Sequence, residues 1–245
     1  MRISPKAAWV LAGLLGAALA WRWFTPSPDQ ALRNRAAQHR EIAARVLGES
    51  LARQFPARRV IVVSNPFVAL PGAAEEIRQF EQAALAGLSR GWGDRIQLLG
   101  VFPPALRPEA LTHPERLPMD PETKTPLSFL QTDRAWDELL AQHPGADVLV
   151  SLIGVPANLA ALELWQHPEP VLALLFPDLR MLGGWEGVEA AITSGKLAAV
   201  VMERPGSPPA SAAPATDDWA EFERRFLLII AENVGAVRAA YPRLF

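Results

Sequence analysis

Residues 59–66 read RVIVVSNP, a run of β-branched residues that ends abruptly at two small polar side chains and a proline. Such a short, continuous apolar run is typical of a strand that is buried on both faces of a parallel sheet. In an open α/β sheet, the residues just past the carboxyl ends of the strands face the crevice in which ligands bind, so Ser64 and Asn65 are candidate ligand contacts. Asn-Pro is also a common turn pair, and this plainer interpretation stays open.

Four more short apolar runs follow along the chain, at residues 95–101, 147–153, 171–176 and 197–202. Helical stretches separate the runs, at about residues 73–89, 127–142, 158–166 and 185–194. This alternation predicts an α/β fold with a mostly parallel sheet of about five strands and helices on both faces, Rossmann- or flavodoxin-like, because parallel strands need crossover connections. We expect this α/β domain to span residues 57–204.

The amino terminus carries the pattern of an export segment. Two positive charges, Arg2 and Lys6, precede an unbroken apolar run at residues 7–21. Aromatic residues near the outer end of the run favour retention of residues 1–25 as a transmembrane signal-anchor, while cleavage after Ala20 stays open. The positive-inside rule then predicts a single-pass protein of the inner (cytoplasmic) membrane, with its soluble domain in the periplasm or outside the cell.

The segments that flank the α/β domain have simpler patterns. The abundance of Ala, Arg and Pro resembles proteins of high-GC bacteria, so single residues of these types receive little weight. Residues 26–56 then read as a helix with a thin apolar stripe, either a membrane-proximal stalk or a helix on the surface of the domain. Residues 205–216 predict a Pro/Ala/Ser linker, and residues 217–245 a C-terminal amphipathic helix that packs on the sheet or binds a protein partner.

One segment breaks the alternation of strands and helices. Residues 103–126 contain seven prolines and are too long for an ordinary connection between a strand and a helix. The segment leaves the carboxyl end of the second predicted strand. It is either a lid or binding arm over the crevice or a stiff surface insertion.

Composition and motifs exclude several classes of function. A net charge of −2 provides no broad basic surface for nucleic acid, and the lack of cysteine excludes disulfides and thiolate chemistry. The familiar phosphate-loop, dinucleotide, zinc-protease and nucleophile-elbow signatures are absent. We therefore expect no catalytic residue, metal or cofactor, although a hydrolase that uses Ser64 or Asp178 stays open.

The candidate ligand-binding residues all lie just past predicted strands, and a parallel sheet would bring them to one edge. They are Ser64, Asn65, Phe67, Asn158, Asp178 and Arg180. Short polar groups can hydrogen-bond a small polar solute, and an aromatic ring can stack on it. Each of these residues can equally have an ordinary loop role.

Residues 187–202 read GVEAAITSGKLAAVVM, a helix, a glycine and a strand. Together with RVIVVSNPF at residues 59–67, this stretch resembles the type I periplasmic, sugar-binding-like solute-binding proteins. The resemblance implies a non-catalytic solute-binding or sensory component of a bacterial envelope. That family closes two lobes on its solute, whereas residues 58–204 suffice for one lobe, so the alternative is a structural or interaction subunit without a ligand site.

Overall fold

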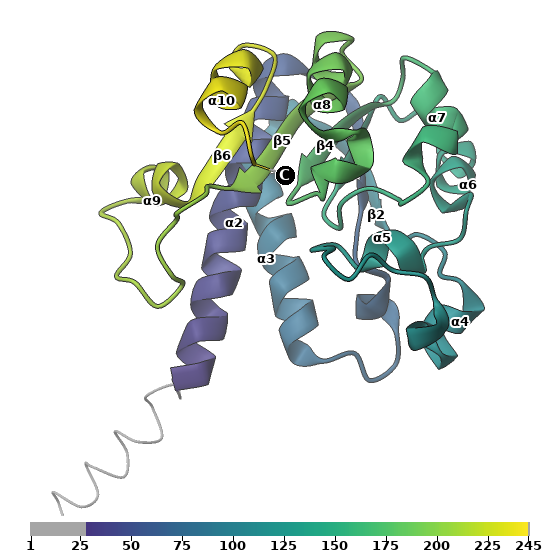
Figure 1. The fold of residues 1–245 in the computed structure, drawn as a ribbon, viewed down its shortest axis with the longest axis horizontal. Coiled ribbons are helices and arrows are strands. Elements are labelled where there is room, and N and C mark those ends of the chain that lie inside the picture. Colours follow the sequence, from purple (N-terminus) through teal and green to yellow (C-terminus); the bar gives the residue numbers. More distant parts are fainter. Residues whose placement is uncertain (1–27, 245) are drawn as a thin grey trace, which may run out of the picture.

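The computed structural model describes residues 28–244, and these contain a single sheet of six strands in the order β2-β1-β3-β4-β5-β6 (Figure 1). The strands are β1 (Arg59–Val63), β2 (Gln97–Phe102), β3 (Val148–Ser151), β4 (Val171–Leu175), β5 (Leu197–Glu203) and β6 (Phe226–Ile229). The first five are parallel, and β6 pairs antiparallel with β5. The predicted mostly parallel α/β sheet is therefore confirmed, with one strand added at its edge.

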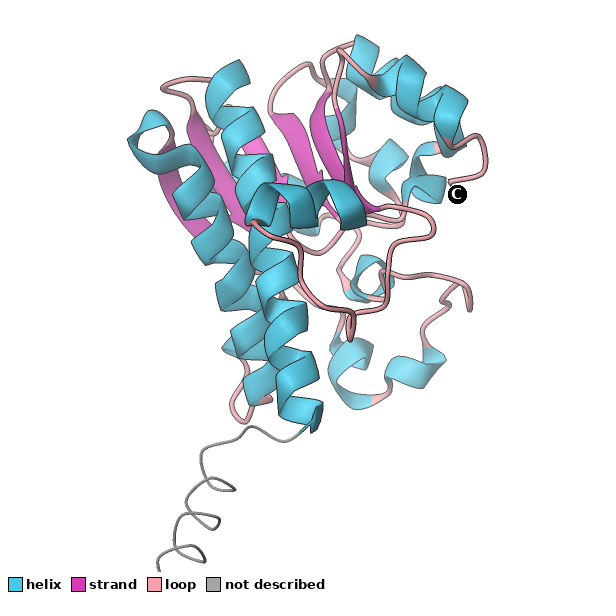
Figure 2. Cartoon of the chain, turned by 90° about the vertical axis from the view of Figure 1, so that its left-hand side faces the viewer, coloured by secondary structure: helices cyan, strands magenta, loops and turns pink. Residues whose placement is uncertain are grey.

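Helices cover both faces of the sheet (Figure 2). They are α2 (Pro28–Gln54), α3 (Glu75–Trp92), α4 (Pro108–Thr112), α5 (Leu127–Leu130), α6 (Ala135–Gln142), α7 (Glu163–Gln166), α8 (Gly184–Thr193), α9 (Asp218–Arg225) and α10 (Val234–Ala240). Val60 and Val62 of β1 face the core shared with α2, α3 and α9, whereas Ile61 and Val63 face the core shared with α6, α8 and α10. The continuous apolar run of β1 thus serves two cores.

Helix α2 belongs to the body of the domain. Its apolar residues Ile42, Val46, Leu47 and Leu51 are buried, and so are the neighbouring alanines, Ala43, Ala44 and Ala52. These alanines, which received little weight in the sequence, broaden the thin stripe into a contact surface for α3 and the sheet. Residues 42–52 of α2 therefore pack on the domain, which is the second of the two roles predicted for this helix.

The predicted single C-terminal helix is wrong. Residues 217–240 form α9, strand β6 and α10. Residues 226–230 are five consecutive apolar residues, and Phe226, Leu227 and Ile229 are buried. A run that is apolar at every position fits a strand buried on both faces as well as a helix, and here the open edge of β5 supplies backbone partners for β6.

Two other predicted helices are interrupted. The stretch 127–142 divides into α5 and α6, and the stretch 158–166 divides into a 3₁₀ turn (Leu159–Ala161) and α7. At the first break Gln131 has extended backbone. Its backbone oxygen accepts a hydrogen bond from Arg107 Nε at 2.8 Å, and its side-chain oxygen accepts one from Trp136 Nε1 at 2.6 Å. The break therefore fastens the 103–126 insertion to the domain.

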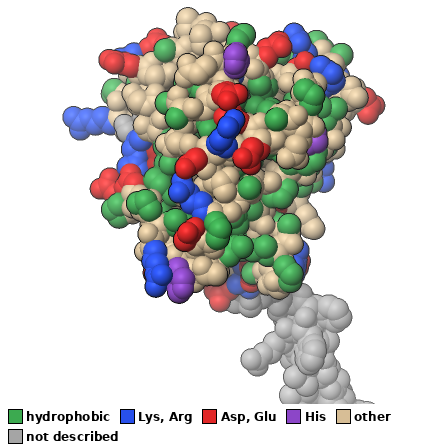
Figure 3. All heavy atoms as spheres, turned by 90° about the vertical axis from the view of Figure 1, so that its right-hand side faces the viewer, with side chains coloured by type: hydrophobic (Ala, Val, Ile, Leu, Met, Phe, Trp, Pro, Cys, Tyr) green, Lys and Arg blue, Asp and Glu red, His purple; other side chains and the backbone are tan. Residues whose placement is uncertain are grey.

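Within residues 28–244, no helix is both long enough and apolar enough to cross a bilayer. The predicted signal-anchor at residues 1–25 lies outside the described residues. On the face of the domain shown in Figure 3, acidic and basic side chains are interspersed among apolar ones. This face carries no continuous field of one charge.

Candidate functional site

A cleft of about 1140 Å³ opens at the carboxyl edge of the sheet. Its floor is formed by residues that follow the parallel strands: Asn65 after β1, Leu152 and Ile153 after β3, Phe176 and Pro177 after β4, and Glu203 and Arg204 at the end of β5. The chain passes from β1 outward to β2 on one side and returns to β3 on the other. Ligands in doubly wound sheets bind at such a point of reversal.

The walls of the cleft come from five other segments. Helix α2 leads into β1 and α3 follows it, and both helices continue past the carboxyl edge of the strands (Figure 2). Their overhanging turns contribute Arg33, Arg40 and Phe80. The remaining walls are residues 124–127 of the insertion and of α5, residues 205–210, and residues 243–244 near the C-terminus.

Arg40 and Glu81 form a buried charge pair in the wall, with 7% and 4% of their surfaces exposed. Arg40 Nη2 lies 3.7 Å from Glu81 Oε2 and donates a hydrogen bond to the Leu152 carbonyl at 2.7 Å. The Arg40 guanidinium also lies over the Phe80 ring, 4.4 Å from its centroid. Burial raises the pKa of Glu81 and lowers the pKa of Arg40, and the attraction between the two charges opposes both shifts.

Asn65 has both of the roles that the sequence left open. Its side-chain oxygen accepts a hydrogen bond from the Phe67 N–H at 2.9 Å and caps the 3₁₀ turn Pro66–Ala69. Its own N–H donates to Glu81 Oε1 at 2.9 Å, and the residue lines the cleft. Ser64 is buried behind it, with its N–H bonded to the Phe102 carbonyl at 3.0 Å. Ser64 and Phe67 do not line the cleft.

The floor contains a strained residue. Phe176 has a φ of 51°, in the left-handed region that residues with a side chain rarely adopt. Such a conformation costs about 1–3 kcal/mol and persists only where the surroundings impose it, as at ligand sites. The Phe176 N–H is fixed by a 2.8 Å hydrogen bond to the Val201 carbonyl, and its ring packs 5.5 Å from that of Phe226.

The predicted linker, residues 205–216, is tied to the domain by a buried charge cluster. Glu221 accepts hydrogen bonds from Arg224, Arg225 and the Ala215 N–H and lies 3.0 Å from His39 Nε2. Burial acts to raise the pKa of Glu221, but the bonds from Arg225 and Ala215 outweigh it and lower the pKa. Arg225 also donates to the Pro208 carbonyl at 2.6 Å, so this cluster holds one rim of the cleft in place.

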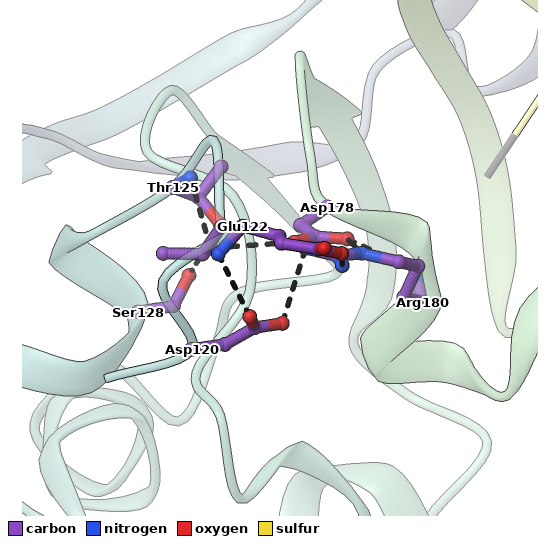
Figure 4. A network of polar contacts seen from close by, with 7 residues as sticks. Asp120, Glu122, Thr125, Ser128, Asp178 and Arg180 are labelled. Carbon is purple, nitrogen blue, oxygen red and sulfur yellow. Dashed lines mark hydrogen bonds and ion pairs between the residues drawn. The ribbon is translucent and has the colours of Figure 1, made fainter. Parts of the chain in front are cut away.

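Asp178 and Arg180 bind each other rather than facing the cleft. Arg180 donates to the Asp178 carboxylate at 2.9 Å and 2.7 Å and reaches Asp120 at 3.2 Å and Glu122 at 3.4 Å (Figure 4). Thr123 donates to Asp178 at 3.2 Å. The Arg180 bonds hold the pKa of Asp178 below its usual value. These contacts join the insertion to the turn after β4, just beside the residues that line the cleft.

The structure thus separates the six predicted ligand residues into three places. Asn65 lies in the cleft, and Ser64 and Phe67 lie next to it. Asp178 and Arg180 hold the insertion, whose residues 124–126 form part of the wall. The Asn158 side chain donates to the Asp133 carbonyl at 2.8 Å, away from the residues that line the cleft.

Several residues that line the cleft were not predicted from the sequence. Arg40, Phe80, Glu81 and Lys124 lie on helices or in the insertion, not directly after strands. One sequence pattern points to Glu81. A helix that follows a strand begins near the carboxyl edge of the sheet, so charged residues in its first turns lie near that edge. Among residues 28–244, no three His, Asp or Glu side chains are grouped so as to hold a metal ion.

No family model and no curated protein sequence matches the chain. Its fold is similar to solved solute-binding proteins. One is a sugar ABC transporter substrate-binding protein from Bordetella parapertussis, with 17% identity, a TM-score of 0.44, and coverage of 80% of this chain and 57% of that one. Another is an ABC transporter periplasmic solute-binding protein from Actinobacillus succinogenes with bound D-allose, with 8% identity, a TM-score of 0.44, and coverage of 80% and 60%.

A third is a carbohydrate transporter from Acidothermus cellulolyticus in complex with myo-inositol, with 14% identity, a TM-score of 0.44, and coverage of 84% of this chain and 62% of that one. The chain thus spans about three fifths of the length of these solved structures. They are solute-binding proteins, the kind of protein that residues 59–67 and 187–202 resemble, and each match covers only part of either chain. The similarity is too low to transfer a ligand or a binding residue.

Proposed function

We propose that this chain is a non-catalytic, extracytoplasmic binding domain that takes a small solute in the cleft at the carboxyl edge of its sheet and is anchored to the inner membrane by residues 1–25. The observation that carries the proposal is the cleft itself. At about 1140 Å³ it is somewhat larger than most small-molecule sites, which range over about 300–1,000 Å³. It lies at the chain reversal between β1 and β3, and residues of this one lobe line it.

The make-up of the cleft supports solute binding. The lining combines apolar side chains, among them Phe80 and Met202, with polar and charged ones that can orient a small ligand. Phe80 keeps 39% of its surface exposed although it lies in this concave wall. An exposed ring in a cleft offers a stacking surface for a ligand. The strained Phe176 in the floor fits the same role.

The test is a thermal denaturation screen of the full chain in detergent against sugars, amino acids, nucleosides and organic acids. A specific ligand at about 100 times its Kd stabilises the folded state by about 2.7 kcal/mol, which corresponds to about 5–10 °C for a chain of this size. Phe80→Ala should reduce the shift, because it removes the exposed ring from the cleft. Trp219→Ala, which truncates an aromatic side chain 49% exposed on α9, is the matched control and should leave the shift unchanged.

Two results count against the proposal. If no compound shifts the melting temperature of the folded chain, the cleft binds no small solute of these classes. If Trp219→Ala and Phe80→Ala reduce the shift equally, the ligand does not occupy the cleft.

The alternative, a structural or interaction subunit, is favoured by a different observation. The predicted interface on the C-terminal segment is mostly internal, since Phe222 and Phe226 are buried and only Trp219 is exposed. Strand β2, however, is an edge strand whose Leu98, Leu99 and Val101 are 45%, 36% and 36% exposed. An exposed apolar edge is a natural pairing site for another chain. Light scattering of the full chain and of Leu99→Lys tests this: a larger assembly that Leu99→Lys dissociates would support it.

A further inference from the structure

We infer that the solute of this cleft is a small organic anion with an apolar body, rather than a neutral sugar. This inference rests on the proposed function and concerns the same site. It follows from the charges that line the cleft, from the way in which they are paired, and from the apolar side chains in the same lining.

The cleft concentrates positive charge. Its lining contains six arginine or lysine residues, which are Arg33, Arg40, Lys124, Arg204, Arg225 and Arg243. It contains three carboxylates, those of Glu76, Glu81 and Glu203. The whole chain has a net charge of −2, so this excess of cations is local to the cleft. A concave surface lined by one sign of charge attracts ligands of the opposite sign.

Pairing within the protein leaves part of this excess uncompensated. Arg33 lies 3.9 Å from Glu76, and Arg40 and Arg225 pair with Glu81 and Glu221. Among the described residues, Lys124, Arg204 and Arg243 have no carboxylate within 4.0 Å. Glu203 is the one carboxylate of the lining that has no basic group within 4.0 Å among the described residues. The lining therefore has three unpaired cations and one unpaired carboxylate, and the three cations come from different segments of the chain.

Two of the arginines also have unused hydrogen-bonding capacity. The Nε atoms of Arg40 and Arg204 are buried and have no hydrogen-bond partner within the part of the chain that the structure describes. The Arg40 side chain as a whole is held by Leu152, Glu81 and Phe80, and Arg204 Nη1 donates to Tyr241 Oη at 2.8 Å. Both Nε atoms are buried beneath the cleft surface, so a ligand in the cleft meets the charge of these guanidiniums rather than their Nε–H groups. A carboxylate or phosphate oxygen is the acceptor that a guanidinium binds best.

The cleft lining also contains apolar side chains. Among them are Ile77, Phe80, Leu152, Ile153, Phe176 and Met202. A neutral sugar presents hydroxyl groups on all sides and needs many side-chain acceptors, and the lining offers few uncharged polar side chains, such as Asn65, Gln79 and Thr125. An acid with a hydrocarbon or aromatic body places its charge against the cations and its body against these side chains.

The experiment compares pairs of ligands with the same skeleton and different charge, by thermal shift and calorimetry on the full chain in detergent. The pairs are benzoate and benzyl alcohol, glucuronate and glucose, and phenyl phosphate and phenol. We expect the acid of a pair to stabilise the chain and its neutral counterpart to do so at least about tenfold more weakly in Kd. Raising the salt from about 50 mM to about 500 mM should weaken binding of the acid, because rim charges are screened.

Two double variants test whether the cations that attract the acid are those of the cleft. Lys124→Gln with Arg243→Gln removes two exposed cations of the cleft rim, and we expect the acid to bind about fivefold to 20-fold more weakly. Arg53→Gln with Arg116→Gln removes two exposed cations that do not line the cleft, Arg116 being in the same insertion as Lys124. This control has the same net charge and should bind the acid as the parent chain does.

The possible results separate the two proposals. Neutral members that bind as tightly as the acids would overturn the anion inference and leave the solute-binding function standing. Equal weakening by both double variants would assign the effect to net charge and overturn the assignment to the cleft. If no member of any pair stabilises the folded chain, the anion inference is overturned, and the proposed function is decided by the wider thermal screen of sugars, amino acids, nucleosides and organic acids.

Discussion

Gly87 of α3 lies against the backbone of α2, and Gly87→Ala tests whether the two helices cross as tightly as the structure shows. A Cβ atom on Gly87 would lie 2.2 Å from the Glu41 carbonyl oxygen, 3.0 Å from Ala44 Cβ and 3.0 Å from the Arg45 nitrogen. Two of these three atoms belong to the backbone of α2, so no side-chain rotation can relieve the contact. The helices must separate by about 1 Å to restore ordinary contact distances.

The expected cost follows from two opposing effects. Overpacking of this kind costs about 1–3 kcal/mol, and the better helix propensity of alanine returns up to about 1 kcal/mol. We therefore expect Gly87→Ala to lower the free energy of unfolding by about 1–2 kcal/mol and the melting temperature by about 2–8 °C. The measurement is thermal and urea denaturation of the full chain in detergent, followed by circular dichroism.

Gly235→Ala in α10 is the matched control, because a Cβ atom at Gly235 would have no heavy atom within 4 Å. It should leave the stability unchanged or slightly increased. A Gly87→Ala chain as stable as the Gly235→Ala chain would refute the tight α2–α3 crossing. The position of the cleft wall would then be in doubt too, because Arg40 precedes Glu41 on the same helix and Phe80 lies two turns before Gly87.

Three further substitutions test buried or partly buried charges by denaturation across a range of pH. Arg180→Gln should destabilise the chain at neutral pH and shift acid unfolding to higher pH: Arg180 lowers the pKa of Asp178, so the stabilisation is present above the unfolded pKa and is lost as pH falls through the lowered folded pKa. His39→Gln should flatten a loss of stability below about pH 6.5, because burial lowers the pKa of His39 and the unfolded chain takes up the proton first. Burial lowers the pKa of Lys196 from 10.5 to about 8, so the stability of the parent chain should rise with pH between these values. Lys196→Met should lose this rise and, with the two carbonyls that Lys196 Nζ binds at 2.8 Å and 2.7 Å left unpaired, cost about 1–3 kcal/mol at neutral pH.

The sheet could largely be predicted from the sequence, because short runs of β-branched residues between turn residues have few alternatives. The predicted strand at residues 59–63 has the observed bounds, and those at 171–176 and 197–202 differ by one residue. Strand β6 was missed because residues 226–230 are apolar at every position, which is compatible with either a helix or a strand. Only the free edge of β5 decides between them, and that edge exists only in the folded protein.

The candidate site was less predictable, since a rule about strand ends finds only residues that follow strands. It found Asn65 in the cleft, and it also selected Asp178 and Arg180. Asp178 and Arg180 carry opposite charges and lie two residues apart. The turn after β4 lets them bind each other, and it lets Arg180 also bind Asp120 of the insertion. Two opposite charges at this spacing can form an ion pair with each other instead of binding a ligand. Their position after a strand does not show which of the two they do.

The cleft wall depends on a difference in length between helices and strands that can be read from residue counts. Strand β1 has five residues and spans about 17 Å, whereas α2 has 27 residues and α3 has 18, or about 40 Å and 27 Å of helix. Helices packed on this strand must therefore extend past it, α3 by about 10 Å and α2 by about 23 Å. Because α2 leads into β1 and α3 follows it, the excess of both helices falls at the carboxyl edge, where it places Arg40 and Phe80 beside Asn65. This overhang gives a single lobe the wall that a second lobe would otherwise provide, and solute binding by one lobe is therefore physically consistent.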